Sequence, residues 1–186
     1  MTVSLEWTDE ALIALPHVGK VELINGELHK MAPSGTEHSD IASVLIIALG
    51  AAVNSDRLGR IYESNAGYRM KSGNVLSPDV SFISAQRLKG RRADYKRFFK
   101  GAPDLAVEIL SPNDSLRETQ AKLPEYFDNG TTLAWIIDPE TTTVQIYTTP
   151  SKPVRILKIS ETLTANPLIP NFSLPLQSLF EHPDFD

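Results

Sequence analysis

The sequence predicts an α/β protein of the α+β type, in which helices are interspersed with mainly antiparallel strands. Three features indicate this class. Asn25-Gly26 separates two strand-like runs within residues 20–31 and favours a β-hairpin. The apolar segment 38–54 has the periodicity of a helix. Near the middle of the chain, a strand over 103–110 leads into a helix over 115–128.

Length and composition indicate one domain spanning residues 1–186, with enough apolar residues for a substantial core. The chain has no cysteine, which excludes disulfides and thiolate metal sites. No signal peptide is apparent, and no apolar run approaches the roughly 20 residues that span a bilayer. We therefore expect a cytoplasmic protein with no membrane segment. The net charge of −5 argues against indiscriminate binding to nucleic acid.

The first elements are a short helix over 8–15, which ends before Pro16, and the hairpin. Glu22 and Glu27 flank the hairpin turn, and either can simply face solvent. Residues 34–37 fit a capping box that starts the helix over 38–54.

That helix is apolar over most of its circumference, so we expect it to pack between a sheet and a second layer, which could be another subunit. His38 lies in its first turn. A lone histidine there is more often a surface or capping residue than a ligand, although it could touch a phosphate at the helix N-terminus.

Strands are expected over 59–64, 66–70 and 75–83, and the last of these carries one acid, Asp79. The segment 87–100 follows, with seven basic residues and one acid, a net charge of +6. Such a segment suits a phosphate backbone, yet a solvated charged loop is at least as common. The residues we expect to contact nucleic acid are Arg91, Arg92, Lys96 and Arg97.

The next strand, over 103–110, carries Glu108, while Asp104 at its entrance is expected to be exposed. The helix over 115–128 holds Lys122 and ends at Asn129-Gly130, and Pro124 predicts a kink beside that lysine. The remaining elements are a central strand over 131–138, strands over 143–147 and 154–159, and a proline-rich tail that we expect to be irregular.

Two strands that each carry a single acid, Asp79 and Glu108, suggest neighbours that share one cation. A hard divalent ion such as Mg²⁺ prefers carboxylate and water oxygens and keeps positions open for a phosphate. The alternative is that both acids lie at strand ends and are solvated, and on the acids alone the two interpretations stand about even. Lys122 likewise follows Glu118 by four residues, the spacing of a routine helical ion pair.

These residues resemble the PD-(D/E)xK nuclease superfamily and, more narrowly, the Uma-two family of putative restriction endonucleases. The resemblance covers residues 20 to about 147. The matching stretches are 21–28, 77–81, 103–112, Lys122 with Tyr126, and 135–139.

The resemblance implies a restriction-endonuclease-like fold with a central mixed β-sheet flanked by helices. It implies Asp79 and Glu108 as ligands of Mg²⁺ (or Mn²⁺), with the backbone carbonyl of Ile109 as a further ligand. Leu110 stands where the superfamily usually has its lysine, so that catalytic role passes to Lys122, and Glu22 looks like the additional catalytic acid.

The expected activity is metal-dependent hydrolysis of DNA phosphodiester bonds by a homodimer. Two other functions stay open: a non-catalytic nucleic-acid-binding or interaction module on a nuclease-like fold, and a hydrolase of another phosphate ester.

Overall fold

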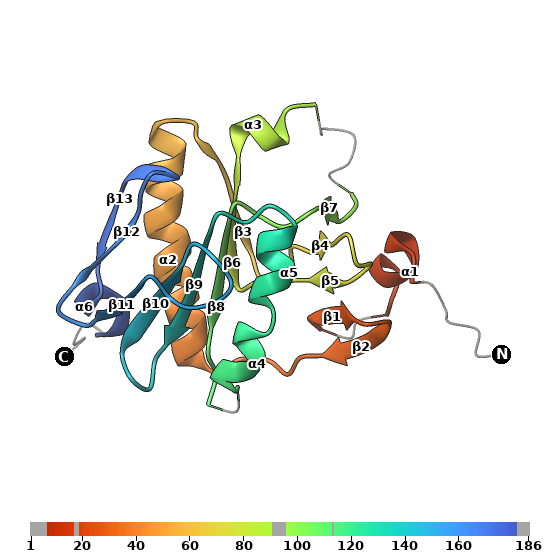
Figure 1. The fold of residues 1–186 in the computed structure, drawn as a ribbon, viewed down its shortest axis with the longest axis horizontal. Helices are drawn as coiled ribbons and strands as arrows, with labels where there is room; N and C mark the ends of the chain where they lie inside the picture. Colours follow the sequence, from red (N-terminus) through yellow and green to blue (C-terminus); the bar gives the residue numbers. More distant parts are fainter. Residues whose placement is uncertain (1–6, 17–18, 91–95, 113, 182–186) are drawn as a thin grey trace.

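A computed structural model describes residues 7–16, 19–90, 96–112 and 114–181. It has mixed sheets flanked by a few helices, which confirms the predicted α/β class (Figure 1). The helices are α1 (Asp9–Ile13), α2 (Thr36–Ser55), α3 (Ala85–Leu88), α4 (Leu116–Gln120), α5 (Leu123–Asp128) and α6 (Gln177–Phe180).

The largest sheet has six strands in the spatial order β11-β10-β9-β8-β6-β3. It is mixed, because β8 and β9 pair in parallel while their other neighbours are antiparallel. The bounds are β3 (Gly59–Glu63), β6 (Val80–Ser84), β8 (Leu105–Ile109), β9 (Leu133–Asp138), β10 (Thr143–Tyr147) and β11 (Arg155–Lys158).

A second sheet of five short strands has the order β2-β1-β5-β4-β7, and β12 and β13 form a separate antiparallel pair. Asn25 and Gly26 both have positive φ, as the predicted hairpin turn between β1 and β2 requires. The bounds are β1 (Val21–Ile24), β2 (Glu27–Lys30), β4 (Tyr68–Arg69), β5 (Val75–Leu76), β7 (Phe99–Lys100), β12 (Thr162–Ala165) and β13 (Ile169–Pro175).

The six-stranded sheet buries both of its faces, which is why β8 and β9 are apolar except for Glu108 and Asp138. Val80, Leu105 and Val107 belong to the cluster that includes the buried residues of α2. Side chains alternate along a strand, so Ala106 faces the opposite cluster, which includes Leu123 and Tyr126 of α5. Glu108, two residues after Ala106, therefore lies on the α5 side.

Helix α2 buries Ile41, Leu45, Leu49 and Val53 against the sheet, at the spacing of one helical face. Contrary to the sequence-based expectation, its 20 residues and mean hydropathy of 1.3 are sufficient for a membrane span by length and composition. Its contacts with β3, β6, β8 and β13 place one face of the helix in the protein core.

Three expectations about local structure were wrong. Residues 75–83 form two strands in different sheets, β5 and β6, and Asp79 lies in the connection immediately before β6. Helix α2 begins at Thr36 after Gly35, which provides no side-chain cap, instead of the predicted capping box. The tail is not irregular, because β12, β13 and α6 pack Leu163, Phe172 and similar residues into the core.

Candidate active site

Three acids from separate elements come together on the α5 side of the six-stranded sheet. Val80 pairs with Val107 in the antiparallel β6–β8 ladder. Continuing that register by one residue places Asp79 opposite Glu108. Glu22 on β1 reaches the same place, where its carboxylate accepts a hydrogen bond from the Ser77 amide (2.9 Å). All three acids are buried, with 2–7 % of their surface exposed.

The Asp79 carboxylate is held by three donors. The Lys20 ammonium donates to Oδ1 (2.8 Å), and the Ile109 amide donates to Oδ2 (2.9 Å). His38 Nε2 lies 3.2 Å from Oδ2, while its Nδ1 is buried without a hydrogen-bond partner among the described residues. Asp79 is thus anchored to the backbone of the residue that follows Glu108.

Lys122 links the other two acids. Its ammonium lies 3.0 Å and 3.1 Å from the two carboxylate oxygens of Glu22 and 3.4 Å and 3.5 Å from those of Glu108. The Tyr126 hydroxyl, one helical turn further on, donates to Glu108 Oε1 (2.5 Å). The arrangement is a buried network of carboxylates and cations in which each group has a partner.

An interruption of the helical segment between α4 and α5 orients Lys122 toward Glu22 and Glu108. The predicted kink is a full interruption between α4 and α5, and Lys122 is the N-cap of α5, with Pro124 in the first turn. Proline is tolerated there because the first amides of a helix have no intrahelical acceptor. Within the described residues, Lys122 pairs with Glu22 and Glu108 and not with Glu118.

Burial and neighbouring charges shift the pKa values of these groups in different directions. Burial would raise the pKa of Asp79, but the hydrogen bond from His38 and the charge of Lys20 lower it below its usual range. Burial raises the pKa of Glu108, and the Asp79 and Glu22 charges add to that rise while Lys122 opposes it. The Asp79 and Glu22 charges thus disfavour ionisation of Glu108, a repulsion that a divalent cation would relieve.

The cations of the site stay protonated more readily than usual. Burial would lower the pKa of Lys122, but Glu108 and Glu22 raise it overall. The hydrogen bond to Asp79 raises the pKa of His38 against the effect of burial. Burial, together with the Glu108 charge, raises the pKa of Tyr126. Lys122 is therefore an ammonium and Tyr126 a neutral phenol near pH 7.

The donor set at Asp79 and Glu108 suits a hard divalent cation. No group of three or more His, Asp or Glu side chains in the described ranges is arranged to hold a metal. Mg²⁺ commonly takes only one or two carboxylates and fills its other positions with water and phosphate oxygens. The Ile109 amide points to Asp79, and the carbonyl of a strand residue points to the same side as its amide. Two carboxylates and one carbonyl are therefore available.

Of the residues that the sequence linked to nucleic acid, the two that the structure describes, Lys96 and Arg97, are not part of this network. Arg91 and Arg92 lie outside the described residues, Lys96 is exposed, and exposed Arg97 pairs with Glu10 (2.9 Å). The expectation that Asp104 is exposed was wrong. Asp104 is buried, because its carboxylate accepts the Ser84 amide (2.8 Å) and supports the β6–β8 sheet.

Lys20 and His38 were missed as members of the site, and Tyr126 was noted only through the family resemblance. Lys20 precedes a hairpin strand and His38 lies in a first helical turn, and both positions are usually solvated. The orphaned ring nitrogen and the contact with Asp79 become visible only once β1, α2 and β6 are placed together.

Comparison with known proteins agrees with the fold. A family model, Uma2, described as "Putative restriction endonuclease", matches residues 9–177. The crystal structure of a putative nuclease belonging to DUF820 from Anabaena variabilis ATCC 29413 is similar, with a TM-score of 0.79 and 22% identity over 94% of this chain and 97% of that one. At this identity the likeness concerns the fold alone. No curated protein matches the chain.

Proposed function

The chain belongs to the Uma2 family of putative restriction endonucleases, and from this membership and the site geometry we propose that it is a metal-dependent nuclease that hydrolyses DNA phosphodiester bonds. The observation that carries the proposal is one ammonium, Lys122, within 3.5 Å of both Glu22 and Glu108, beside an Asp79 that is fixed to the Ile109 amide. Buried titratable groups whose pKa values are shifted by specific charged partners mark candidate functional sites.

Asp79, Glu108 and the Ile109 carbonyl would hold Mg²⁺ or Mn²⁺, which supplies a Lewis acid that activates water and neutralises phosphate charge. Lys122 remains protonated, so it stabilises the negative charge that develops on the phosphate instead of acting as a base. Glu22 aims the ammonium of Lys122, and Tyr126 fixes the Glu108 carboxylate. Lys20 and His38 orient Asp79.

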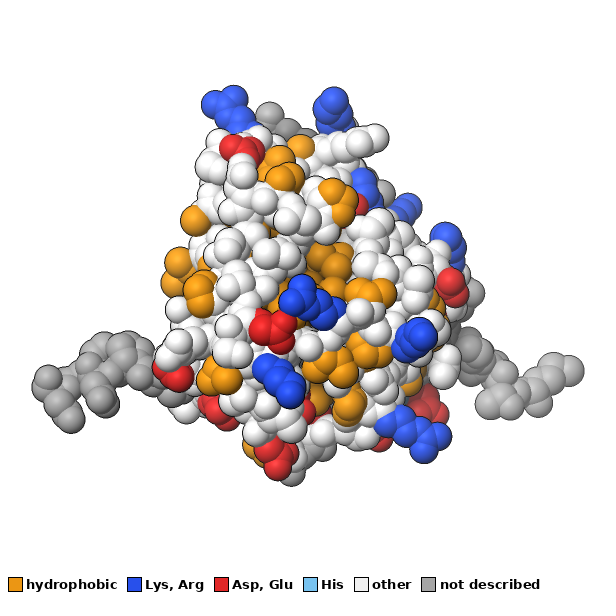
Figure 2. All heavy atoms as spheres, turned by 60° about the vertical axis from the view of Figure 1, so that its left-hand side comes forward, with side chains coloured by type: hydrophobic (Ala, Val, Ile, Leu, Met, Phe, Trp, Pro, Cys, Tyr) orange, Lys and Arg blue, Asp and Glu red, His pale blue; other side chains and the backbone are white. Residues whose placement is uncertain are grey.

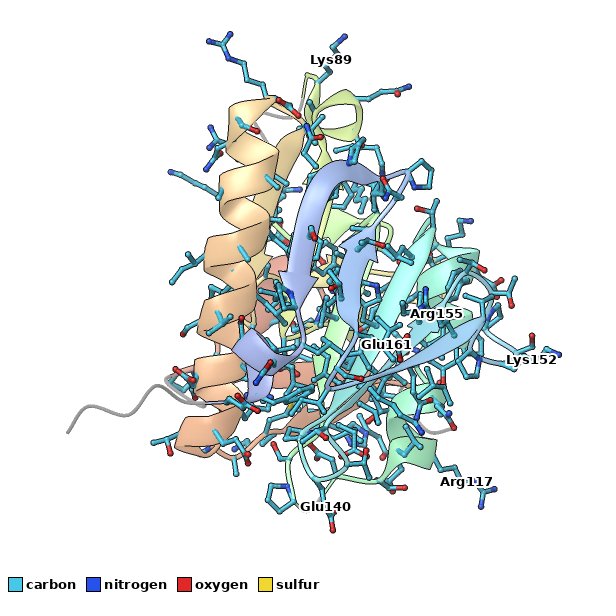
Figure 3. All side chains as sticks on the ribbon, turned by 90° about the vertical axis from the view of Figure 1, so that its left-hand side faces the viewer. Lys89, Arg117, Glu140, Lys152, Arg155 and Glu161 are labelled. Carbon is cyan, nitrogen blue, oxygen red and sulfur yellow. The ribbon has the colours of Figure 1, made fainter. Side chains whose placement is uncertain are left out.

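Plasmid cleavage with Mg²⁺ or Mn²⁺ tests this proposal. We expect wild type to nick or linearise the plasmid, and Asp79→Asn and Glu108→Gln to reduce the rate roughly a hundredfold or more. Glu140→Gln is the matched control, since this exposed acid lies in the β9–β10 turn and points outward (Figure 3). Tight DNA binding without metal-dependent cutting would instead favour a non-catalytic binding module.

We also propose that the protein acts as a homodimer through the outer side of α2. Ile47 is 72% exposed there, and a groove of about 390 Å³ runs past it to Arg60 and Ile61 of β3, the edge strand of the six-stranded sheet. Ile47→Asp is expected to convert a dimer to a monomer in sedimentation velocity. Val154→Asp, which changes an apolar residue that is 60% exposed elsewhere, is expected to leave it unchanged.

A further inference from the structure

A cavity of about 490 Å³, separate from the cluster of acids, is lined by residues of α1, β3, β4, α3 and β7, elements that extend from the centre and top of Figure 1 to its right-hand side. Its walls are largely apolar and include four aromatic side chains: Tyr62, Tyr68, Phe98 and Phe99. Ile13 at its margin is 50% exposed, an apolar surface that nothing in the described part of the chain covers fully. Cavities of this size and lining are typical of sites for small or inserted organic groups.

The aromatic walls are held in place by neighbouring side chains and backbone. Phe98 packs against Gly67, where even a methyl group would come within 2.4 Å of its ring. Phe99 lies 5.9 Å from the Tyr68 ring, and the Tyr68 hydroxyl is fixed by Ser81 (2.6 Å). Flat, rigid aromatic surfaces of this kind are platforms on which nucleobases stack.

Positively charged, negatively charged and neutral polar side chains border the cavity. Lys96 and Arg97 supply positive charge, although Arg97 also pairs with Glu10. Asn65 and Glu63 are exposed at the rim and joined by a hydrogen bond (2.9 Å), so they present an amide and a carboxylate. Cations suit a phosphate, while an amide and a carboxylate suit the donors and acceptors on the edge of a base.

Strand β6 connects the cavity to one of the acids, Asp79. Ile83 of β6 lines the cavity, and Asp79, four residues earlier, immediately precedes that strand. Four residues of strand correspond to roughly 13 Å, which is about four base steps at the 3.4 Å spacing of one DNA strand. By contrast, the side of the molecule drawn in Figure 2 shows lysines and arginines interspersed with acids and no continuous basic surface.

We propose that this cavity binds an unpaired nucleobase of the DNA strand, with the adjoining phosphate against Lys96 and Arg97, a few nucleotides from the bond at the acids. The inference rests on the proposed nuclease function and adds a preference for single-stranded or locally opened DNA. An extruded base stacks among the aromatic walls, which a paired base inside a duplex cannot do.

The test uses a short single-stranded oligodeoxynucleotide that carries one 2-aminopurine, with the matching duplex as comparison, in EDTA to prevent cutting. We expect binding to quench the fluorescence and Phe98→Leu to weaken single-strand binding roughly 5- to 150-fold, with little effect on the duplex. Lys96→Gln, at an exposed position, is expected to lower the slope of log affinity against log salt by about 0.7.

Lys152→Gln is the matched control, because this exposed lysine lies in the β10–β11 loop and projects from the far edge of the molecule (Figure 3). Wild-type affinity and quenching in both Phe98→Leu and Lys96→Gln, with plasmid cutting intact, would overturn the base-binding inference alone. Binding and quenching that depend on Phe98, without metal-dependent cutting, would overturn the nuclease proposal and leave the base site standing.

Discussion

Replacing Lys122 by methionine tests whether one ammonium holds the acidic cluster together. The substitution keeps most of the volume of the side chain and removes a charge that contacts two buried carboxylates. Removing one partner of a buried ion pair costs about 3–5 kcal/mol. The Lys122 side chain is 17% exposed, so the lower end applies, about 3 kcal/mol of unfolding free energy.

The pKa of Glu108 is already raised, so in the variant this carboxyl can take up a proton and recover part of the loss. The destabilisation of Lys122→Met should therefore be smaller at pH 5 than at pH 7. At neutral pH a loss of about 3 kcal/mol corresponds to a midpoint lowered by roughly 6–12 °C for a chain of this size.

Urea and thermal unfolding in EDTA, repeated with Mg²⁺, measure these effects. A divalent cation replaces the missing positive charge, so we expect Mg²⁺ to stabilise Lys122→Met more than wild type. Lys152→Met is the control and is expected to change stability by less than about 0.5 kcal/mol. A Lys122→Met protein as stable as wild type in EDTA, at both pH values, would refute the idea that this ammonium neutralises the cluster.

Three further predictions concern single groups. Tyr126→Phe removes the donor to Glu108 and is expected to cost about 1.5–3 kcal/mol in urea unfolding at pH 7. The raised pKa of His38 means that its protonated form stabilises the fold, an effect fully present below about pH 6.5 and lost as pH rises through the folded-state value. The difference in unfolding free energy between wild type and His38→Gln should therefore shrink as pH rises. Gly59→Ala would place a methyl group 2.0 Å from the Ile83 carbonyl oxygen and is expected to cost about 1–3 kcal/mol.

Each of these has a clear contrary outcome. An unchanged stability in Tyr126→Phe would mean that the hydroxyl makes no net contribution at Glu108. A His38→Gln difference that grows with pH would reverse the sign of the proposed coupling. For the glycine, Gly35→Ala is the control, since nothing lies within 4 Å of a methyl group at that position.

Much of the fold follows from local pattern. The Asn25-Gly26 turn, the α2 stripe and the mainly apolar runs of β8 and β9 each specify one element. The split of residues 75–83 between two sheets could not be predicted in this way, because a chain that turns at Ser77-Pro78 has the same apolar composition as one continuous strand. The tail was missed because its prolines suggested loops, whereas Pro170 and Pro175 lie within or at the end of β13 in a two-stranded sheet, where few ladder amides are needed.

Only part of the candidate site could be predicted from local sequence patterns. Asp79 and Glu108 stand out because a single acid in an apolar run requires a partner. Lys20 and His38 do not stand out, since a lysine or histidine at an element's end is ordinarily solvated. Their roles depend on the β1–β2 hairpin and the start of α2 closing over the connection before β6, a tertiary arrangement that local patterns do not encode.

Glu22 and Lys122 touch although one hundred residues separate them along the chain. During synthesis on the ribosome, Glu22 in the hairpin therefore emerges long before Lys122, whose ammonium neutralises its charge. A nascent polypeptide carries Glu22 and Glu108 without the Lys122 ammonium until α5 has followed, so the chain can assemble a complete centre only late in translation.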